Sequence, residues 1–224
     1  MGTRLRSLIH NVPKPMAAVG DRPFLHYVLD YLLGQGVRSV ILSVGYMHEI
    51  ISGHFGERYK NVDISYSVER EPLGTGGAIR QAMREVAEDY VCVMNGDTLF
   101  PIDLSEMYRL VVKSKADVVV AGRVVADIDR YGSIVLEGDR IVSFSSSSSE
   151  KAYGIINGGV YLIRNHVFEE FDLPTVFSFE KDFLAANILQ LDTRCVPFES
   201  YFIDIGIPED YMRANRELPG MHHG

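Results

Sequence analysis

The sequence predicts an α/β fold: a mainly parallel sheet with helices on both faces, and a small antiparallel addition. In the first half of the chain, apolar runs rich in branched residues alternate with amphipathic stretches of helical period. After about residue 129 the runs shorten and turn residues become more frequent. The 224 residues, 46% hydrophobic and 23% charged, suit one globular domain and exclude a disordered or collagen-like chain.

Strand and helix patterns alternate between residues 23 and 122. The predicted helices begin with a stretch that has Pro23 in its first turn and ends near Gly34. Strands joined by helices of about ten to fifteen residues predict right-handed parallel crossovers. The strands are expected at 39–44, 62–68, 90–94 and 117–121, and the helices at 23–33, 76–86 and 104–112.

The second half of the chain has a different rhythm. Short strands at 132–136, 140–144 and 157–163 predict an antiparallel excursion, about residues 129–163, at the edge of the sheet. Helices at about 179–190 and 208–217 would complete a single domain over residues 1–224. The serine tract at 145–149 favours a loop.

The charge balance limits the possible partners. The chain has 22 Lys and Arg against 30 Asp and Glu, a net charge of −8, so an anionic ligand must be met by a local cationic site such as a divalent metal. Cys92 and Cys195 lack metal-ligand spacing, and the longest apolar runs are too short to span a membrane. We therefore expect a reduced, cytoplasmic protein with no nucleic-acid or membrane partner.

A glycine-rich segment at residues 74–77 follows the second predicted strand. Its spacing to Asp97 superficially matches a dinucleotide fingerprint, but Ile79 replaces the third small residue and residues 69–73 separate the glycines from their strand. A helix cap is the other alternative. Because glycines inside a helix cost about 1 kcal/mol each, we favour backbone N–H groups that face a nucleotide.

Two acids follow apolar runs. Asp97 lies in an Asn-Gly-Asp turn after the strand at 90–94, and Asp204 lies between the apolar residues Ile203 and Ile205. A carboxylate among apolar side chains needs a compensating partner, and a divalent cation shared by Asp97 and Asp204 would supply it. An ordinary turn for Asp97, and an N-cap or buried salt bridge for Asp204, are the alternatives.

The N-terminal region carries several cations. Arg4 and Arg6 precede Lys14, which lies between Pro13 and Pro15. The prolines fix the backbone around Lys14, which favours a lysine that reaches a phosphate. The alternative is that these cations are exposed and only increase solubility.

Several motifs occur in the order seen in one enzyme family: G-T-R-L, P-K-P, E-P-L-G-T-G-G-A, N-G-D, R-Y-G, I-N-G-G-V-Y and F-I-D-I-G-x-P-E-D-Y. From residue 2 to about 215 the chain thereby resembles the sugar-1-phosphate nucleotidyltransferases. The stretches P-K-P-M-A, L-S-V-G-Y and F-S-F-E-K-D are most similar to the D-glycero-D-manno-heptose 1-phosphate guanylyltransferases. Mannose-1-phosphate guanylyltransferases are near neighbours.

The resemblance implies a Rossmann-like fold of the nucleotide-diphospho-sugar transferase type with a small sugar-binding lobe. It implies Mg²⁺-dependent transfer of GMP from GTP to a heptose 1-phosphate, which gives an NDP-sugar and pyrophosphate. By motif position it implies catalytic roles for Arg4, Lys14, Asp97 and Asp204, of which Asp97 and Asp204 hold the metal; nucleotide contacts from Gly2, Thr3, Glu71, Gly74, Thr75 and Gly76; and sugar contacts from Gly132, Asn157 and Lys151.

Two departures from the family pattern leave alternatives open. The family begins with a strand and L-A-G-G-x-G-T-R-L, so we expect its first strand to be missing before residue 1. The family has an E-K motif just after a strand like that at 141–144, where this chain has serines. Glu150 and Lys151 match the motif only if a loop displaces it along the chain. Another sugar or base, or a non-catalytic nucleotide- or sugar-binding regulatory subunit, remains an alternative, and the sequence leaves the sugar epimer and the oligomeric state open.

Overall fold

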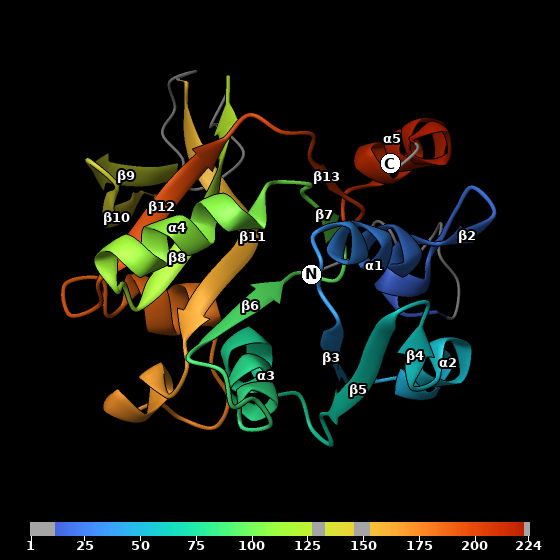
Figure 1. Cartoon of the computed structure of the whole chain (residues 1–224), viewed down its shortest axis with the longest axis horizontal. Helices are drawn as coiled ribbons and strands as arrows, with labels where there is room; N and C mark the ends of the chain where they lie inside the picture. The colour runs from blue at the N-terminus through green and yellow to red at the C-terminus, as the bar shows by residue number, and fades with distance from the viewer. Residues whose placement is uncertain (1–11, 127–132, 146–152, 222–224) are drawn as a thin grey trace. The chain divides into compact units, whose positions relative to one another are not determined.

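The computed structural model describes residues 12–126, 133–145 and 153–221 (Figure 1). The described residues form two compact units. The first contains the described parts of residues 1–71, 95–101 and 201–224, and the second those of 72–94 and 102–200. Both units combine strands with helices, so the predicted α/β class is confirmed.

A three-stranded sheet organises the first unit. Strands β3 (Ser39–Val44) and β5 (Val62–Val68) are parallel, and β4 (Arg58–Tyr59) is antiparallel to β5. The parallel pair needs a crossover, which helix α2 (His48–Phe55) supplies. Helix α2 was not predicted from the sequence because it is short and buries only Ile51 and Phe55.

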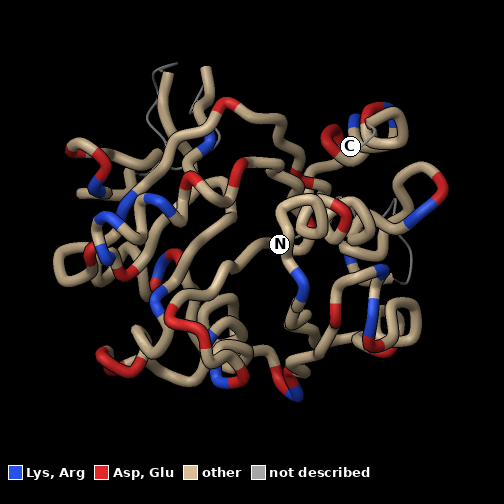
Figure 2. The backbone as a smooth tube through the Cα atoms, in the orientation of Figure 1, with Lys and Arg blue, Asp and Glu red and all other residues tan. Residues whose placement is uncertain are grey.

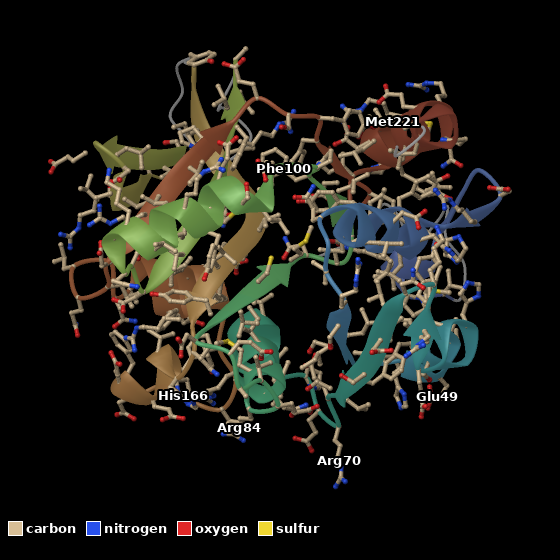
Figure 3. The ribbon with its side chains drawn as sticks, viewed as in Figure 1. Glu49, Arg70, Arg84, Phe100, His166 and Met221 are labelled. Carbon is tan, nitrogen blue, oxygen red and sulfur yellow. The ribbon has the colours of Figure 1, made fainter. Side chains whose placement is uncertain are left out.

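The rest of the first unit surrounds helix α1 (Phe24–Gly34), which buries seven residues. The helix was predicted with Pro23 in its first turn, and the structure instead has Pro23 as its N-cap. It contacts η1 (Lys14–Met16) and β7 (Thr98–Leu99). Strand β7 pairs with β13 (Ile203–Asp204), and α5 (Pro208–Glu217) follows as predicted. Phe100, labelled in Figure 3, is fully buried. Its ring lies edge-on against that of Phe202 at 5.4 Å between ring centres. A short hairpin, β1 (Ala18–Val19) and β2 (Arg22–Pro23), precedes α1.

The second unit contains a mixed six-stranded sheet in the order β6-β11-β8-β12-β10-β9. The predicted strands correspond to β6 (Tyr90–Met94), β8 (Val118–Val125), β9 (Ser133–Glu137), β10 (Arg140–Ser145) and β11 (Gly154–Arg164). Strand β12 (Thr193–Phe198), which was not predicted, is parallel to β8. The predicted helices correspond to α3 (Gly74–Met83), α4 (Leu104–Ser114) and a π-helix, η3 (Phe179–Ala185).

Strand β11 corrects one part of the prediction. The antiparallel strands were expected at the edge of a mainly parallel sheet, and β10 and β9 are the last two strands in the order, although β9 also pairs with β11. Strand β11 instead lies inside the sheet, antiparallel to both β6 and β8. The reason is its apolar second half: residues 158–163 are all buried, so this strand is most stable with neighbours on both edges.

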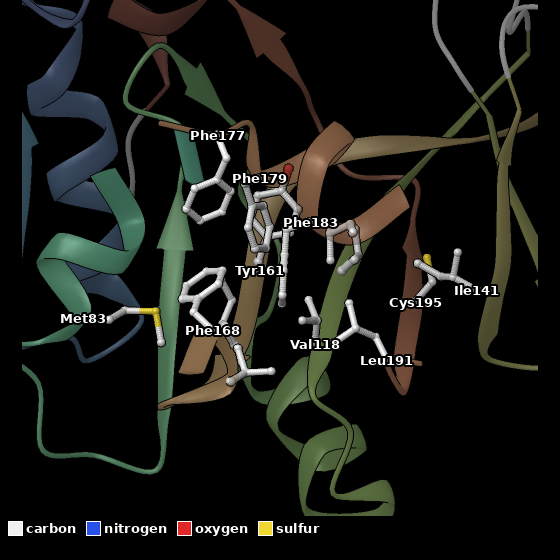
Figure 4. Packing of buried hydrophobic residues seen from close by; sticks show 14 of the residues in the cluster. Met83, Val118, Ile141, Tyr161, Phe168, Phe177, Phe179, Phe183, Leu191 and Cys195 are labelled. Carbon is white, nitrogen blue, oxygen red and sulfur yellow. The ribbon is translucent and has the colours of Figure 1, made fainter. Parts of the chain in front are cut away.

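An aromatic cluster forms the core of the second unit (Figure 4). Side chains from one face of β8 and β11, among them Val118, Val120 and Tyr161, pack against α3 and η3. Helix α4 packs against β8, β11 and β12. The aromatic members contributed by η3 and the chain around it are Phe168, Phe177, Phe179 and Phe183.

Charged residues of both signs are interspersed along the chain (Figure 2). Both cysteines are free. Among the described residues, no helix combines the length and the apolar character needed to cross a membrane.

Candidate active site

The two predicted metal-binding acids, Asp97 and Asp204, are brought together by the β7–β13 pair of the first unit. Asp204 pairs with Thr98 in this two-stranded sheet, and the Ile205 N–H donates to the Asp97 carbonyl oxygen at 3.0 Å. Residues more than a hundred positions apart in the sequence therefore sit on adjacent strand ends. The predicted proximity of the two carboxylates is consistent with this geometry.

Lys14 lies beside the same pair. Its Nζ is 3.4 Å from Asp97 Oδ2, and its side chain is 45% exposed. Pro13 precedes the 3-10 turn that begins at Lys14, and the Pro15 ring lies so close to Gly96 that a Cβ there would be 3.4 Å from its Cγ. The prolines thus fix the backbone that carries Lys14, as the sequence indicated.

The Asp204 carboxylate lies in an environment that disfavours its charged form. Burial raises the pKa of Asp204 most, the nearby Asp97 carboxylate raises it further, and the Gly206 N–H and Lys14 act in the opposite direction. Asp204 Oδ1 accepts the Gly206 N–H at 2.7 Å, and a Cβ at Gly206 would lie 2.9 Å from that oxygen. Asp204 is not the N-cap of α5, a position held by Ile207. Two anionic carboxylates near each other therefore share one lysine.

Oxygen ligands suit a hard divalent cation, and this pair fits one. Asp97 and Asp204 supply carboxylate oxygens. Asp204 is partly buried beside a second acid, and these two causes, burial first, raise the pKa of its carboxyl, which favours a site that gains from a bound cation. Among residues 12–126, 133–145 and 153–221, no group of three or more His, Cys, Asp or Glu side chains could hold a metal ion. The remaining ligands would therefore come from the substrate or water, as is usual for Mg²⁺.

The glycine-rich segment begins helix α3 in the second unit. Gly74 has φ +72°, and a Cβ on it would lie 2.5 Å from the Phe177 carbonyl oxygen. A Cβ on Gly76 would overlap the Phe177 ring, and one on Gly77 would lie 2.6 Å from the Thr175 carbonyl oxygen. The glycines thus allow the segment around Phe177 to approach the helix.

This packing occupies part of the backbone that was expected to face a nucleotide. The Gly76 N–H donates to the Phe177 carbonyl oxygen at 2.9 Å, and the Phe177 N–H donates to the Leu73 carbonyl oxygen at 3.0 Å. The Thr75 Oγ1 accepts the Phe179 N–H at 2.9 Å and donates to Glu180 Oε2 at 3.1 Å. Gly76 therefore has a packing role that the sequence did not reveal.

Asn157, the predicted sugar contact, lies at a bulge in β11. The register with β8 shifts between Asn157 and Tyr161, and Gly159 has φ +72°. Four residues of a regular strand span about 13 Å, yet Asn157 Nδ2 donates to the Tyr161 hydroxyl at 2.8 Å. The Gly159 N–H donates to Asn157 Oδ1 at 3.0 Å. The bulge therefore bends the chain back and brings Asn157 next to Tyr161. Both the amino group and the oxygen of the Asn157 side-chain amide are hydrogen-bonded.

The remaining predicted residues have different positions. Glu71 is exposed in the first unit. The described ranges do not include Gly2, Thr3, Arg4, Gly132 or Lys151. Two residues were not expected beside the predicted contacts: Tyr161, whose hydroxyl accepts the Asn157 amide, and Glu180, which accepts the Thr75 hydroxyl. The F-S-F-E-K-D stretch contains Glu180 and was the one signal for it.

Curated relatives identify the type of protein. Residues 1–220 match the family model described as nucleotidyl transferase. The chain is 46% identical over 221 residues to the D-glycero-alpha-D-manno-heptose 1-phosphate guanylyltransferase of Aneurinibacillus thermoaerophilus, covering 97% of this chain and 94% of that protein. It is 44% identical over 212 residues to the protein of the same name from Campylobacter jejuni, covering 94% and 93%.

Solved structures agree with this match. The crystal structure of HddC from Yersinia pseudotuberculosis has a TM-score of 0.85 and 34% identity, covering 97% of this chain and 95% of that one. HddC has also been solved in complex with GMP-PN, with a TM-score of 0.84. The UDP-glucose pyrophosphorylase of Acinetobacter baumanii, at 20% identity and a TM-score of 0.79, shares the fold alone. The chain therefore belongs to the nucleotidyl transferase family and has the α/β fold of the nucleotide-diphospho-sugar transferases.

Proposed function

We propose that this protein transfers GMP from GTP to D-glycero-D-manno-heptose 1-phosphate, forming a GDP-heptose and releasing pyrophosphate. Two relatives with 46% and 44% identity carry the name of this activity, and this chain covers 94% and 93% of their lengths. The related HddC has been solved with GMP-PN. The observation that carries the proposal is the convergence of Asp97, Asp204 and Lys14 in one place.

The chemistry makes few demands on proton transfer. A phosphate oxygen of the sugar 1-phosphate attacks the α-phosphorus of GTP, a new P–O–P bond forms, and the bond to pyrophosphate breaks. The attacking oxygen is already an anion, so a general base is not required. The protein's task is to position two anionic groups and reduce their repulsion.

Lys14 and the two acids suit this task. The partly exposed Lys14 ammonium would bind a phosphate oxygen, and we propose the same role for Arg4. Asp97 and Asp204 would hold Mg²⁺, which when bound supplies positive charge to the triphosphate. Because Lys14 lies 3.4 Å from Asp97, it would also orient that carboxylate.

The other contacts are proposed from motif positions. The nucleotide would meet Gly2, Thr3, Glu71, Gly74, Thr75 and Gly76, and Gly76 also allows the close packing of Phe177. The sugar would meet Asn157, which the bulge of β11 holds in a fixed orientation, with Gly132 and Lys151 as further contacts. We also propose a cytoplasmic location, where nucleoside triphosphates are made, and the two free cysteines suit a reducing compartment.

A pyrophosphate-release assay tests the proposal. Four nucleoside triphosphates would be combined with a panel of hexose and heptose 1-phosphates, with and without Mg²⁺. We expect pyrophosphate only when GTP, Mg²⁺ and the heptose 1-phosphate are all present. Equal rates with every base would contradict the guanylyl assignment, and a higher rate with mannose 1-phosphate would contradict the heptose assignment. No rate with any sugar would favour a non-catalytic binding protein.

A lysine pair provides the matched control. Lys14→Met should lower the rate about a hundredfold because it removes a charge from the phosphates. Lys113→Met changes an exposed lysine in the last turn of α4 and should leave the rate unchanged. Equal rates for the two variants would remove Lys14 from the mechanism.

A further inference from the structure

One carboxylate in the second unit links two predicted contact residues. Glu180 Oε1 accepts the Tyr161 hydroxyl at 3.3 Å, and Glu180 Oε2 accepts the Thr75 hydroxyl at 3.1 Å. Ser178 Oγ also donates to Oε2, at 3.3 Å. Tyr161 in turn receives the Asn157 amide. A chain of hydrogen bonds therefore runs from Asn157 through Tyr161 and Glu180 to Thr75, over 105 positions of sequence between Thr75 and Glu180.

The direction of these hydrogen bonds is fixed at one end by the backbone. The Gly159 N–H can only donate, so the Asn157 oxygen must face it and the Asn157 amino group must face Tyr161. Tyr161 then accepts from Asn157 and must donate to Glu180. Burial raises the pKa of Tyr161, which keeps the phenol protonated and able to donate. Glu180 therefore has to supply an acceptor at Oε1.

The local structure holds Glu180 rigidly. Ser178 is the N-cap of η3, accepting the Lys181 N–H at 3.2 Å, and the Thr75 hydroxyl oxygen accepts the Phe179 N–H. The Phe179 ring is fully buried and lies 4.9 Å from the Tyr161 ring in an edge-to-face arrangement. A π-helix such as η3 is rare and is frequently found at functional sites.

We propose that Glu180 is a positioning residue that orients Asn157 for the sugar 1-phosphate through Tyr161 and holds Thr75 for the nucleotide. This inference rests on the proposed function. With its oxygen held by Gly159 and one amino proton held by Tyr161, Asn157 keeps one N–H and one lone pair for hydroxyl groups of the sugar. The orientation of that donor and acceptor pair would follow from Glu180.

Three variants separate the two branches of the network. Tyr161→Phe breaks the link between Asn157 and Glu180 but leaves the Thr75 hydroxyl bonded to Glu180. The KM for the sugar 1-phosphate should therefore rise about tenfold while the KM for GTP changes less than about twofold. Glu180→Ala releases both Asn157 and Thr75, so both KM values should rise. Glu180→Gln can still present its oxygen to Tyr161, so the KM for the sugar should stay near that of the wild type.

Tyr90→Phe is the matched control. It removes the hydroxyl of a half-buried tyrosine of the second unit, which donates to the Ala116 carbonyl oxygen at 2.9 Å. If loss of stability alone mattered, Tyr90→Phe and Tyr161→Phe would change the kinetics alike. An unchanged KM for the sugar in Tyr161→Phe, or equal changes in both KM values, would overturn the proposal.

A second measurement does not depend on turnover. Hydrogen exchange of the Asn157 side-chain amide, followed by NMR, should be slow in the wild type and in Tyr90→Phe, and at least about tenfold faster in Tyr161→Phe and Glu180→Ala. If the wild type turns over no sugar 1-phosphate, the proposed function fails, and this exchange still decides whether Glu180 positions Asn157. Equal exchange in all four proteins would show that it does not.

Discussion

Asp204 in the first unit and Glu180 in the second are both partly buried carboxylates, but they receive very different numbers of donors. In the described part of the chain, Glu180 accepts three hydroxyl groups, from Tyr161, Thr75 and Ser178. Asp204 accepts one backbone N–H and faces another acid, and the pKa of its carboxyl is raised. Glu180 is thus satisfied by the protein, whereas Asp204 has capacity left for a cation. A satisfied carboxylate positions its neighbours, and an undercompensated one is available to a ligand.

The largest expected effect comes from Asp97→Asn. The amide keeps the shape of the side chain and loses the charge that a hard cation needs, so the rate of GMP transfer should fall about a hundred- to a thousandfold. Asp63→Asn is the control, since its exposed ion pair with Arg58 contributes little. Steady-state rates at saturating Mg²⁺ measure both. A near-normal rate for Asp97→Asn would show that Asp97 has a structural role. The acidic pair would then not differ from Glu180 in being available to a cation.

Asp204→Asn should separate activity from stability. The rate should fall as for Asp97→Asn, but the free energy of unfolding without divalent cations should increase, because a buried charge and its repulsion with Asp97 are removed. We expect a rise in Tm of about 2–4 °C at neutral pH, equivalent to about 1 kcal/mol. Thermal melting in EDTA measures this. An unchanged or lower Tm would show that Asp204 is already well compensated.

Gly76→Ala tests how tightly the second unit is filled. The added Cβ would overlap the Phe177 ring, and overpacking of this kind costs about 3 kcal/mol. Gly53→Ala, in the middle of α2 with nothing within 4 Å of its Cβ, should be neutral or stabilising. Urea unfolding compares the two. Partial rescue of Gly76→Ala by Phe177→Leu would confirm the cause, and equal stability of both glycine variants would contradict it.

The smallest expected effect concerns a histidine pair in the first unit. His26 Nε2 lies 2.8 Å from His54 Nε2, and His26 Nδ1 lies 3.1 Å from the Tyr59 hydroxyl, which donates to Asp30. Burial, and next the charge of His54, lower the pKa of His26. Below the unfolded pKa of about 6.5, the unfolded chain therefore binds protons more readily than the folded one. The free energy of unfolding should fall as the pH drops through this range.

Two variants isolate this histidine. His26→Gln should flatten the decline in stability between about pH 7.5 and 5.5, whereas His166→Asn should preserve it. His166 is an exposed residue with φ +63°, a conformation that Asn tolerates. Chemical denaturation across this pH range measures the slopes. A decline that persists in His26→Gln would assign it to other groups. In that case, titratable groups of the first unit other than Asp97, Asp204 and His26 would also lack full compensation by their hydrogen-bond partners.

The acidic pair could be predicted from sequence, and the Glu180 network could not. Asp97 and Asp204 each follow an apolar run, where an uncompensated carboxylate is costly enough to indicate a function. The role of Glu180 depends on a bend in β11 and on contacts with Thr75, which is distant in sequence. The spacing of residues along the sequence does not reveal contacts between residues that are distant in it.

Sheet order shows the same limit. Alternating strand and helix patterns predicted most elements, but residue patterns do not state which strands are neighbours. Strand β12 was missed because Arg194 and Pro197 interrupt its apolar pattern, although parallel pairing with β8 makes it a full member of the sheet. The packing role of Gly76 was missed because its packing partner, Phe177, lies far along the chain.

The bulge of β11 has a consequence for how this site can change. Asn157 faces Gly122 and Tyr161 faces Val120, so four steps along β11 match two steps along β8. The surplus is an even number, so the side chains of both halves of the strand keep their faces. Deleting one residue here would move the side chains of half of β11 to the opposite face of the sheet. Deleting two would leave a regular strand in which Asn157 and Tyr161 no longer meet. The bulge is thus an insertion of two residues whose removal would leave the pairing of the flanking strand residues unchanged.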